Sequence, residues 1–180
     1  MTKITVMSLN IDAFYFINNS LANPFFDAIM PPLSDCGGFV TLLVLSVLAV
    51  VLSKYFKKDK YYNIARLCLY SLLLAGIIAA CLKLIFHSPR PYTVLDHVRQ
   101  LTVPTEPNSF PSGHSASTVS IITVLVWKLR ENRLIVVLLI AFAVLVGFSR
   151  IYCGVHYPFD VVTGAAAGVV SGVVVLKVFD

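Results

Sequence analysis

Three short segments of the sequence contain residue types that could hold and cleave a phosphate group. They are KLIFHSPRP (residues 83–91), PSGH (111–114) and SRIYCGVHYPFD (149–160). Three cations lie among them, Lys83, Arg90 and Arg150, and these would repel one another in a partly dry pocket. A bound phosphate removes that repulsion, and guanidinium groups match its oxygens geometrically. These residues therefore predict a phosphate-binding site.

The second segment predicts a helix start that faces the same anion. PSGH directly precedes an apolar run, and the free backbone N–H groups and dipole of a helix N-terminus favour negative charge. We expect Gly113 to let the backbone approach the phosphate closely. We expect Ser112 to add a hydroxyl donor, so both residues are candidate phosphate ligands.

Two histidines are candidates for the nucleophile and the general acid. His156 and Asp160 are four residues apart, which places them on one face if a helix begins there, and Pro158 suits a first helical turn. The carboxylate would accept a hydrogen bond from one imidazole nitrogen and leave the other nitrogen free to attack phosphorus. His114 would then protonate the leaving oxygen.

The deduced reaction passes through a phosphohistidine that water hydrolyses, and we expect it to need no metal and no cofactor. Side chains supply the positive charge, and the other carboxylates show no metal-loop spacing. Each residue alone has a plainer interpretation, because Lys83 could snorkel to the membrane interface and Arg90 and Arg150 could anchor outer loops. Five ionisable groups on one side of a membrane bundle together favour function.

The rest of the chain predicts an all-α, integral membrane helical bundle. Of its 180 residues, 58% are hydrophobic and 13% are charged, whereas soluble domains are about 25% charged. A spanning helix needs about 20 mostly apolar residues, and five stretches approach that length: 39–56, 64–86, 112–127, 134–151 and 159–178. Segment 1–36, which we expect to be broken at Pro31-Pro32, predicts one or two interfacial helices. We therefore expect five to six transmembrane helices in one domain, 1–180, with its transmembrane core at 39–178.

The distribution of basic residues predicts the orientation of this bundle. The net charge is +5, but many of the cations lie in two loops, KYFKKDKYYNIAR and KLRENR. This pattern is typical of cytoplasmic membrane loops and not of a nucleic-acid-binding surface. The three segments then lie at the extracytoplasmic face of the cell membrane. In the last stretch Gly164, Gly168 and Gly172 share one helix face, which favours packing within the bundle, with a homodimer as the alternative.

The three segments together resemble the signature of the type 2 phosphatidic acid phosphatase family, whose superfamily also includes vanadium-dependent haloperoxidases. Every signature position is present with its spacing: Lys83-x6-Arg90-Pro91, Pro111-Ser112-Gly113-His114 and Ser149-Arg150-x5-His156-x3-Asp160. The resemblance implies a helical membrane bundle with a metal-independent phosphatase site. It implies that His156 is the nucleophile, His114 the acid and Asp160 the orienting partner. The phosphate ligands it implies are Lys83, Arg90, Ser112, Gly113 and Arg150.

The expected function is that of a lipid phosphate phosphatase acting on a phosphomonoester or a pyrophosphate. Candidate substrates are phosphatidic acid, phosphatidylglycerol phosphate and undecaprenyl or another polyprenyl pyrophosphate, which the resemblance to small prokaryotic polyprenyl pyrophosphatases ranks first. One alternative is a lipid phosphotransferase that uses the same phosphohistidine. Another is a non-catalytic lipid-phosphate binding or transport component. The pairing of His156 with Asp160 argues against the latter, because binding alone needs no nucleophile.

Overall fold

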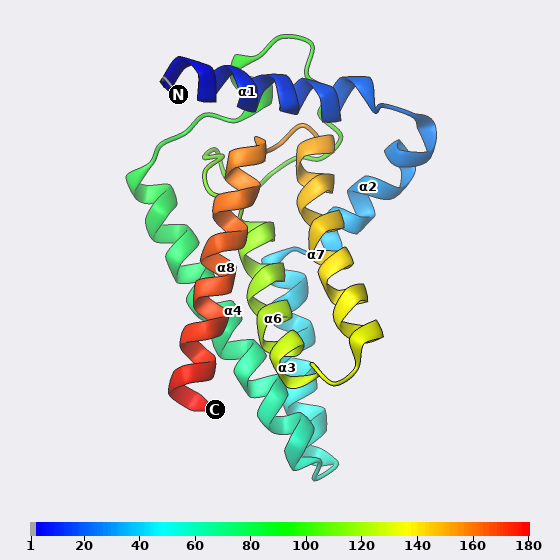
Figure 1. Ribbon diagram of the computed structural model, residues 1–180, viewed down its shortest axis with the longest axis vertical. Helices are drawn as coiled ribbons and strands as arrows, with labels where there is room; N and C mark the ends of the chain where they lie inside the picture. Colours follow the sequence, from blue (N-terminus) through cyan, green and yellow to red (C-terminus); the bar gives the residue numbers. More distant parts are fainter. Residues whose placement is uncertain (1–2) are drawn as a thin grey trace.

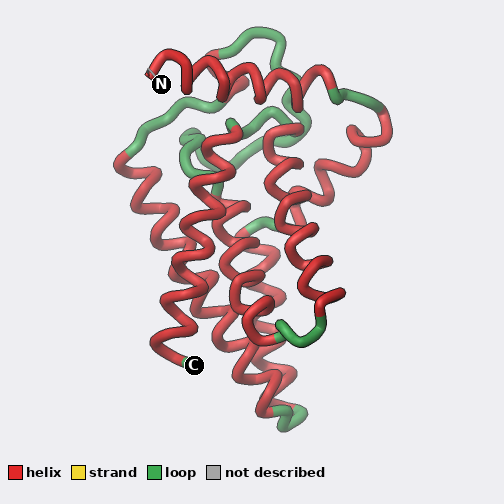
Figure 2. The backbone as a smooth tube through the Cα atoms, in the orientation of Figure 1, coloured by secondary structure: helices red, strands yellow, loops and turns green. Residues whose placement is uncertain are grey.

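The computed structural model describes residues 3–180, and this part of the chain folds into helices and loops with no β-strand (Figures 1 and 2). The prediction of an all-α membrane bundle is confirmed, and each of the five apolar stretches becomes a helix. The elements are α1 (Lys3–Tyr15), the π-helical segment η1 (Phe16–Ser20), α2 (Pro24–Cys36), α3 (Phe39–Tyr55), α4 (Asp59–Ile85), α5 (Pro91–Val94), α6 (Gly113–Lys128), α7 (Arg133–Tyr152) and α8 (Pro158–Phe179).

Three single helices are long and apolar enough to cross a membrane, namely α4, α7 and α8. Helices α2 and α3 together also qualify, as one broken span or re-entrant pair bent by 52°. Helix α6 has 16 residues, fewer than the roughly 20 that a full span requires. By length and composition the described chain thus has three spans, or four with the bent pair, and the count of five to six stays a prediction. The division into segments 1–36 and 39–178 also stays a prediction.

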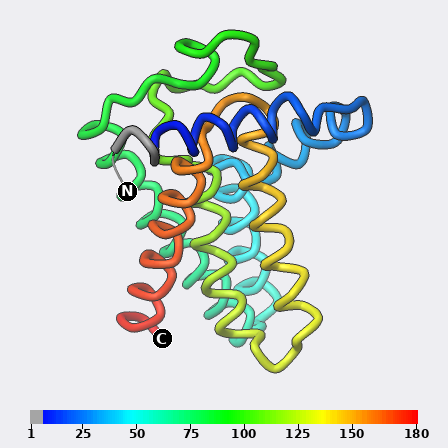
Figure 3. The backbone as a smooth tube through the Cα atoms, turned by 45° about the horizontal axis from the view of Figure 1, so that its top comes forward, coloured from blue at the N-terminus to red at the C-terminus, as the bar shows by residue number. Residues whose placement is uncertain are grey.

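The N-terminal helices cap one end of the bundle. Helix α1 lies across that end, and α2 then leads into α3 (Figures 1 and 3). Asn18 of η1 is fully buried and links the N-terminal helices to the rest of the bundle through hydrogen bonds. Its Nδ2 donates to the carbonyl oxygens of Arg99, at 2.9 Å, and Tyr152, at 2.8 Å. Its Oδ1 accepts the backbone N–H of Arg99 at 2.9 Å, so the cap is fixed to the loop that follows α5.

The break that we expected at Pro31-Pro32 lies elsewhere, because α2 continues through both prolines to Cys36. A proline inside a helix removes one hydrogen bond and crowds the carbonyl four residues earlier, and here the helix continues past both prolines. The chain turns instead at Gly37-Gly38. A Cβ on Gly37 would lie 2.4 Å from Cγ1 of Val146, so the break brings backbone into direct contact with α7.

Helix α6 lies at the centre and contacts α3, α4, α7 and α8. Its approach to α8 depends on the glycine face of α8, since a Cβ on Gly164 would lie 2.4 Å from the carbonyl oxygen of Ser112. A Cβ on Gly168 would lie 2.6 Å from the carbonyl oxygen of Ala116, and Gly172 is buried on the same face. These three glycines pack within the chain, and pairing with a second copy stays a prediction.

The two ends of the bundle differ in chemistry. The turns at 56–58 and 129–132, which belong to the basic loops, lie together at the end away from α1 (Figure 1). At that end Lys128 of α6 also pairs with Asp180. Loops 86–112 and 153–157 lie at the end that α1 covers (Figures 1 and 3). The fold therefore places the three segments that contain the predicted site residues at the end of the bundle opposite the basic loops.

Candidate active site

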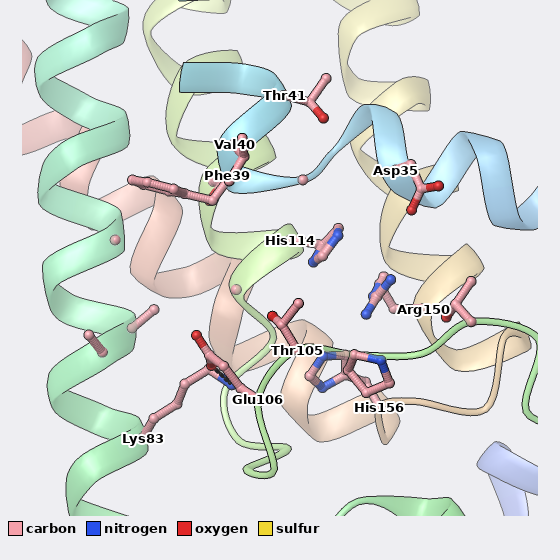
Figure 4. Close-up of a pocket in the computed structure, with 18 of the residues that line it drawn as sticks. Asp35, Phe39, Val40, Thr41, Lys83, Thr105, Glu106, His114, Arg150 and His156 are labelled. Atoms are coloured by element: carbon pink, nitrogen blue, oxygen red, sulfur yellow. Dashed lines mark ion pairs between the residues drawn. The ribbon is translucent and has the colours of Figure 1, made fainter. Parts of the chain in front are cut away.

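A cavity of about 860 Å³ lies between α3, α4, α6 and the loop that contains residues 102–106. Six of the eight predicted site residues line it: Lys83, Arg90, Gly113, His114, Arg150 and His156. They come from the end of α4, the turn before α5, the start of α6, the end of α7 and the turn before α8 (Figure 4). Ser112 and Asp160 contact this group from behind and do not line the cavity.

Arg90 is anchored by backbone carbonyls on both sides of the cavity. Its side chain is almost fully buried, and its Nε donates to the carbonyl oxygen of Glu106 at 2.9 Å. Its Nη1 donates to the carbonyl oxygen of Val155 at 2.8 Å and lies 3.3 Å from Nε2 of His156. The guanidinium is thus fixed beside the predicted nucleophile.

Arg150 has a buried donor without a partner. The residue is only 3% exposed, and its Nη1 donates to the hydroxyl of Ser34. Within residues 3–180 its buried Nε has no hydrogen-bond partner. A buried guanidinium donor is costly to leave unpaired. Because Arg150 also lines the cavity, this donor is suited to an anionic ligand there.

Lys83 lies at the side of the cavity formed by α4. Its Nζ donates to the carbonyl oxygen of Asn108 at 2.8 Å and lies 3.2 Å from Oε2 of Glu106. The Glu106 side chain is 59% exposed, so this ion pair is screened by solvent. The ammonium can therefore turn toward a phosphate in the cavity at little cost.

His156 and Asp160 form the predicted pair, with Nδ1 of His156 3.4 Å from Oδ2 of Asp160. The carboxylate also accepts the backbone N–H of Tyr157 at 2.9 Å, which closes the first turn of α8. On the other side of the ring, Nε2 faces the Arg90 guanidinium, which can only donate. These partners assign the proton to Nδ1 and the lone pair to Nε2, where the Arg90 guanidinium contacts it.

The surroundings of His156 favour its neutral form. The pKa of His156 is lowered from its ordinary value of 6.5 to about 4, and burial is the largest cause. The hydrogen bond with Asp160 raises the pKa and offsets burial only in part, while the charges of Arg150 and Arg90 lower it further. At neutral pH the imidazole is therefore uncharged, as a nucleophile must be.

The helix start predicted from PSGH is present, and the role of Ser112 as a phosphate ligand stays a prediction. Ser112 is the N-cap of α6, and its hydroxyl oxygen accepts the N–H of Ser115 at 3.3 Å and the hydroxyl of Ser115 at 2.9 Å. Its side chain is fully buried and faces away from the cavity. At Gly113 no atom lies within 4 Å of the place a Cβ would take, so the backbone there faces open space.

His114 lies against the break between α2 and α3. A Cβ built on Gly38 would lie 3.5 Å from Nε2 of His114. Asp35, at the end of α2, also lines the cavity near His114 and Arg150 (Figure 4). His114, in the first turn of α6, and His156, in the turn before α8, thus line the same cavity.

Sequence reasoning missed several residues of the site. Ser109 contacts both Asp160 and His156, Ser34 contacts Arg150, and Asp35 lines the cavity. None of the three belongs to the recognised segments. Of the three, only Ser109 could have been suspected from the sequence, because it lies two residues before the PSGH segment.

Comparison with known proteins agrees with this geometry. The model of the PAP2 superfamily matches residues 64–180. The "Bacitracin transport permease protein BcrC" of Bacillus licheniformis is 35% identical over 176 residues, which cover 93% of this chain and 79% of that protein. The "Undecaprenyl-diphosphatase BcrC" of Bacillus subtilis (strain 168) is 32% identical over 108 residues, 59% of this chain and 54% of that protein.

A solved structure shares the fold over nearly the whole length. The crystal structure of LpxE from Aquifex aeolicus has a TM-score of 0.79 at 33% identity, covering 94% of this chain and 95% of that chain. The family model spans well over half of the sequence, and its match contains all eight predicted site residues. The chain belongs to the PAP2 superfamily and is a membrane phosphatase of that superfamily.

Proposed function

We propose that the protein hydrolyses a lipid phosphomonoester or diphosphate at the extracytoplasmic face, through a phosphohistidine at His156. The protein is a membrane lipid phosphatase of the PAP2 superfamily. One observation carries the finer proposal: Arg90, Arg150 and Lys83 converge on a single cavity with His114 and His156. Fixed cations around two imidazoles suit an anionic ester that one imidazole attacks.

In the first half-reaction Nε2 of His156 attacks phosphorus while the P–O bond to the leaving group breaks. His114 gives its proton to the leaving oxygen. Arg90 is placed to bind a phosphate oxygen beside the attacking nitrogen, and the unpartnered Nε of Arg150 supplies another donor. These cations stabilise the charge that spreads over the phosphoryl oxygens in the transition state.

In the second half-reaction a water molecule attacks the phosphohistidine and the N–P bond breaks. His114, now neutral, accepts the proton of that water, and inorganic phosphate leaves. Asp160 keeps its hydrogen bond to Nδ1 and stabilises the cationic ring of the intermediate. Burial, and after it the charges of Arg150 and the other nearby cations, lower the pKa of His114, and the negative charge of a bound substrate phosphate acts in the opposite direction.

The apolar side of the cavity supports a lipid substrate. Phe39 and Val40 of α3 and Leu73 and Ile77 of α4 line it, and Val40 and Ile77 are largely exposed on the outside of the bundle. A lipid tail in the bilayer can pack on these side chains while its headgroup enters among the cations. The relative in Bacillus subtilis named undecaprenyl-diphosphatase ranks a polyprenyl diphosphate first, before phosphatidic acid and phosphatidylglycerol phosphate.

The extracytoplasmic location rests on the distribution of charge. The turns of the basic loops lie at the end of the bundle away from α1, and the loops that contribute residues 102–106 and His156 to the cavity lie at the end that α1 covers (Figure 1). Loops rich in Lys and Arg stay on the cytoplasmic side of a membrane. The headgroup of the substrate would then be cleaved on the opposite side.

The test uses purified protein in detergent and a panel of three lipids: undecaprenyl diphosphate, phosphatidic acid and phosphatidylglycerol phosphate. We expect phosphate release with a chelator present, and fastest release from undecaprenyl diphosphate. His156→Ala should abolish turnover, whereas His87→Ala should keep it, because His87 is exposed and does not line the cavity. An active His156→Ala protein would contradict the nucleophile assignment.

Trapping the intermediate separates hydrolysis from the alternatives. His114→Ala should accumulate labelled phosphoenzyme from a labelled lipid, since the acid–base group that assists water is missing. Phosphorylation of an added lipid or sugar acceptor by the wild-type protein would instead identify a phosphotransferase. Tight lipid binding without phosphate release or phosphoenzyme would identify a binding or transport component.

A further inference from the structure

Ser109 lies outside the three signature segments, yet it contacts the partner of the nucleophile. Its side chain is fully buried, and its hydroxyl donates to Oδ2 of Asp160. The hydroxyl oxygen of Ser109 also lies 3.5 Å from Nδ1 of His156. Ser109 does not line the cavity, so its hydroxyl faces the back of the histidine–aspartate pair.

The orientation of Asp160 depends on donors other than the imidazole. The distance from Nδ1 of His156 to Oδ2 is 3.4 Å, longer than the roughly 2.7–2.9 Å of a charge-assisted hydrogen bond. Two closer donors contact the same oxygen: the Ser109 hydroxyl, and the backbone N–H of Tyr157 at 2.9 Å. The Tyr157 N–H belongs to the turn of α8 itself, so Ser109 is the side chain that ties Asp160 to another part of the site.

Ser109 lies in a short loop segment, residues 106–109, whose backbone also contacts two of the cations. Its N–H donates to the carbonyl oxygen of Ser88 at 2.8 Å. The neighbouring carbonyl of Asn108 accepts Nζ of Lys83, and the carbonyl of Glu106 accepts Nε of Arg90. Residues 106–109 therefore join the phosphate-binding cations to the histidine–aspartate pair.

We propose that Ser109 is a positioning residue, which holds the Asp160 carboxylate so that Nε2 of His156 stays aimed at the phosphorus atom. The proposal rests on the proposed function, in which His156 is the nucleophile. Because Ser109 contacts no substrate, its loss should slow attack and leave substrate binding nearly unchanged. A small misplacement of a reacting group can cost about 100-fold in rate.

Three substitutions separate the hydroxyl from the volume of the side chain. Ser109→Ala removes the donor, Ser109→Cys keeps the size with a weak donor, and Ser109→Thr keeps the hydroxyl. We expect Ser109→Ala to lower kcat by about 10-fold to 100-fold with KM changed less than about threefold. Ser109→Thr should stay closer to the wild-type kcat than Ser109→Cys.

One control variant and one inhibition assay separate a specific effect from general damage to the fold. Ser171→Ala is the matched control, because Ser171 is equally buried but bonds to Ala167 within its own helix, and it should keep kcat and KM. Competitive inhibition by inorganic phosphate reports whether each variant retains a folded cavity. If Ser109→Ala does not fold, the order of the Cys and Thr variants decides the question.

The proposal is overturned if Ser109→Ala keeps the wild-type kcat, if it raises KM alone, or if the Cys variant matches or exceeds the Thr variant. His156→Ala, measured alongside, separates this outcome from failure of the proposed function. An active His156→Ala protein rejects the phosphohistidine mechanism. An inactive His156→Ala protein with a fully active Ser109→Ala protein rejects only the role of Ser109.

Discussion

Arg90 and His156 are in contact, with Nη1 of Arg90 3.3 Å from Nε2 of His156. A guanidinium can only donate hydrogen bonds, so this contact selects the tautomer of His156 whose lone pair is on Nε2. The same guanidinium lines the cavity in which the phosphate would bind. In the proposed mechanism, one side chain would therefore fix the tautomer of the nucleophile and also bind the phosphate that it attacks.

Replacing Arg90 by lysine should be severe although the charge is kept. The guanidinium donates to the carbonyl oxygens of Glu106 and Val155, and a single ammonium cannot keep that geometry and still reach a phosphate. Losing hydrogen bonds of a charged group costs about 1.5–3 kcal/mol each, so we expect kcat/KM to fall by about 100-fold. Steady-state kinetics on the preferred lipid should show this.

The matched control for Arg90→Lys is Arg130→Lys. Arg130 lies in the turn after α6, at the basic end of the bundle, where it stacks on Trp127. This variant should keep kcat/KM within about twofold, because it lies far from the cavity. Equal losses in the two variants would show that the cost comes from general destabilisation and not from the site.

The pH dependence of the reaction should reflect a histidine that resists protonation. Burial lowers the pKa of His156 from 6.5 to about 4, and Arg150 and Arg90 act in the same direction, against the raising effect of Asp160. The neutral nucleophile should therefore persist as pH falls from 7 to 5 and be lost only near pH 4. In values of kcat/KM corrected for ionisation of the substrate phosphate near pH 6, the loss that comes from protonation of His156 should therefore appear only near pH 4.

The lowered pKa of His156 also makes the stability of the fold depend on pH. Between pH 6.5 and 4 the unfolded chain binds a proton at His156 that the native protein does not bind, so the contribution of this group destabilises the fold as pH falls.

A corrected rate profile that breaks near 6.5 would mean that His156 is as easily protonated as a free histidine. That outcome would contradict the buried, cation-flanked position described above.

The convergence of the predicted cations and His114 on one cavity could be predicted because these residues belong to segments with a specific local spacing. Lys83, Arg90 and Gly113 belong to short segments, and the positive loops alone indicated that all three segments share one face of the membrane. The five apolar stretches also predicted their helices, because hydrophobicity over about 20 residues is a strong signal. Hydrophobicity and short-range spacing were thus enough to predict the helices and most of the residues that line the cavity.

The site residues that could not be predicted depend on contacts between parts of the chain that are far apart in the sequence. Ser109 reaches Asp160 across 51 positions, and Ser34 reaches Arg150 across 116, distances over which spacing carries no information. Asp35 enters the cavity because the chain breaks at Gly37-Gly38 rather than at the two prolines. Ser112 caps its own helix, since an N-cap hydroxyl is already satisfied by backbone N–H groups.

The glycine face of α8 should be intolerant of larger residues. A Cβ on Gly168 would lie 2.6 Å from the carbonyl oxygen of Ala116 and 2.9 Å from Cβ of Val119, so Gly168→Val must separate α8 from α6. Overpacking of this kind costs about 1–3 kcal/mol, and the thermal midpoint in detergent should fall. Ala166→Val, at an exposed position two residues earlier, should leave it unchanged.

The same pair of variants tests the homodimer alternative. If Gly168 packed against a second copy of the chain, Gly168→Val would convert a dimer into a monomer and leave the midpoint of the monomer intact. Size-exclusion chromatography with light scattering, run beside the thermal scan, distinguishes the two cases. We expect a lower midpoint with no change in mass.

The orientation in the membrane can be tested at the two ends of the bundle. Val103 is 90% exposed at the rim of the cavity, and Glu131 is exposed in the turn between α6 and α7. In a background with the exposed Cys36 and Cys81 replaced by serine, Val103→Cys should react with an impermeant maleimide on intact cells. Glu131→Cys should react only after permeabilisation, because loops rich in Lys and Arg stay in the cytoplasm. The opposite labelling pattern would place the cavity on the cytoplasmic side and reject the extracytoplasmic part of the proposed function, while leaving the phosphohistidine chemistry untouched.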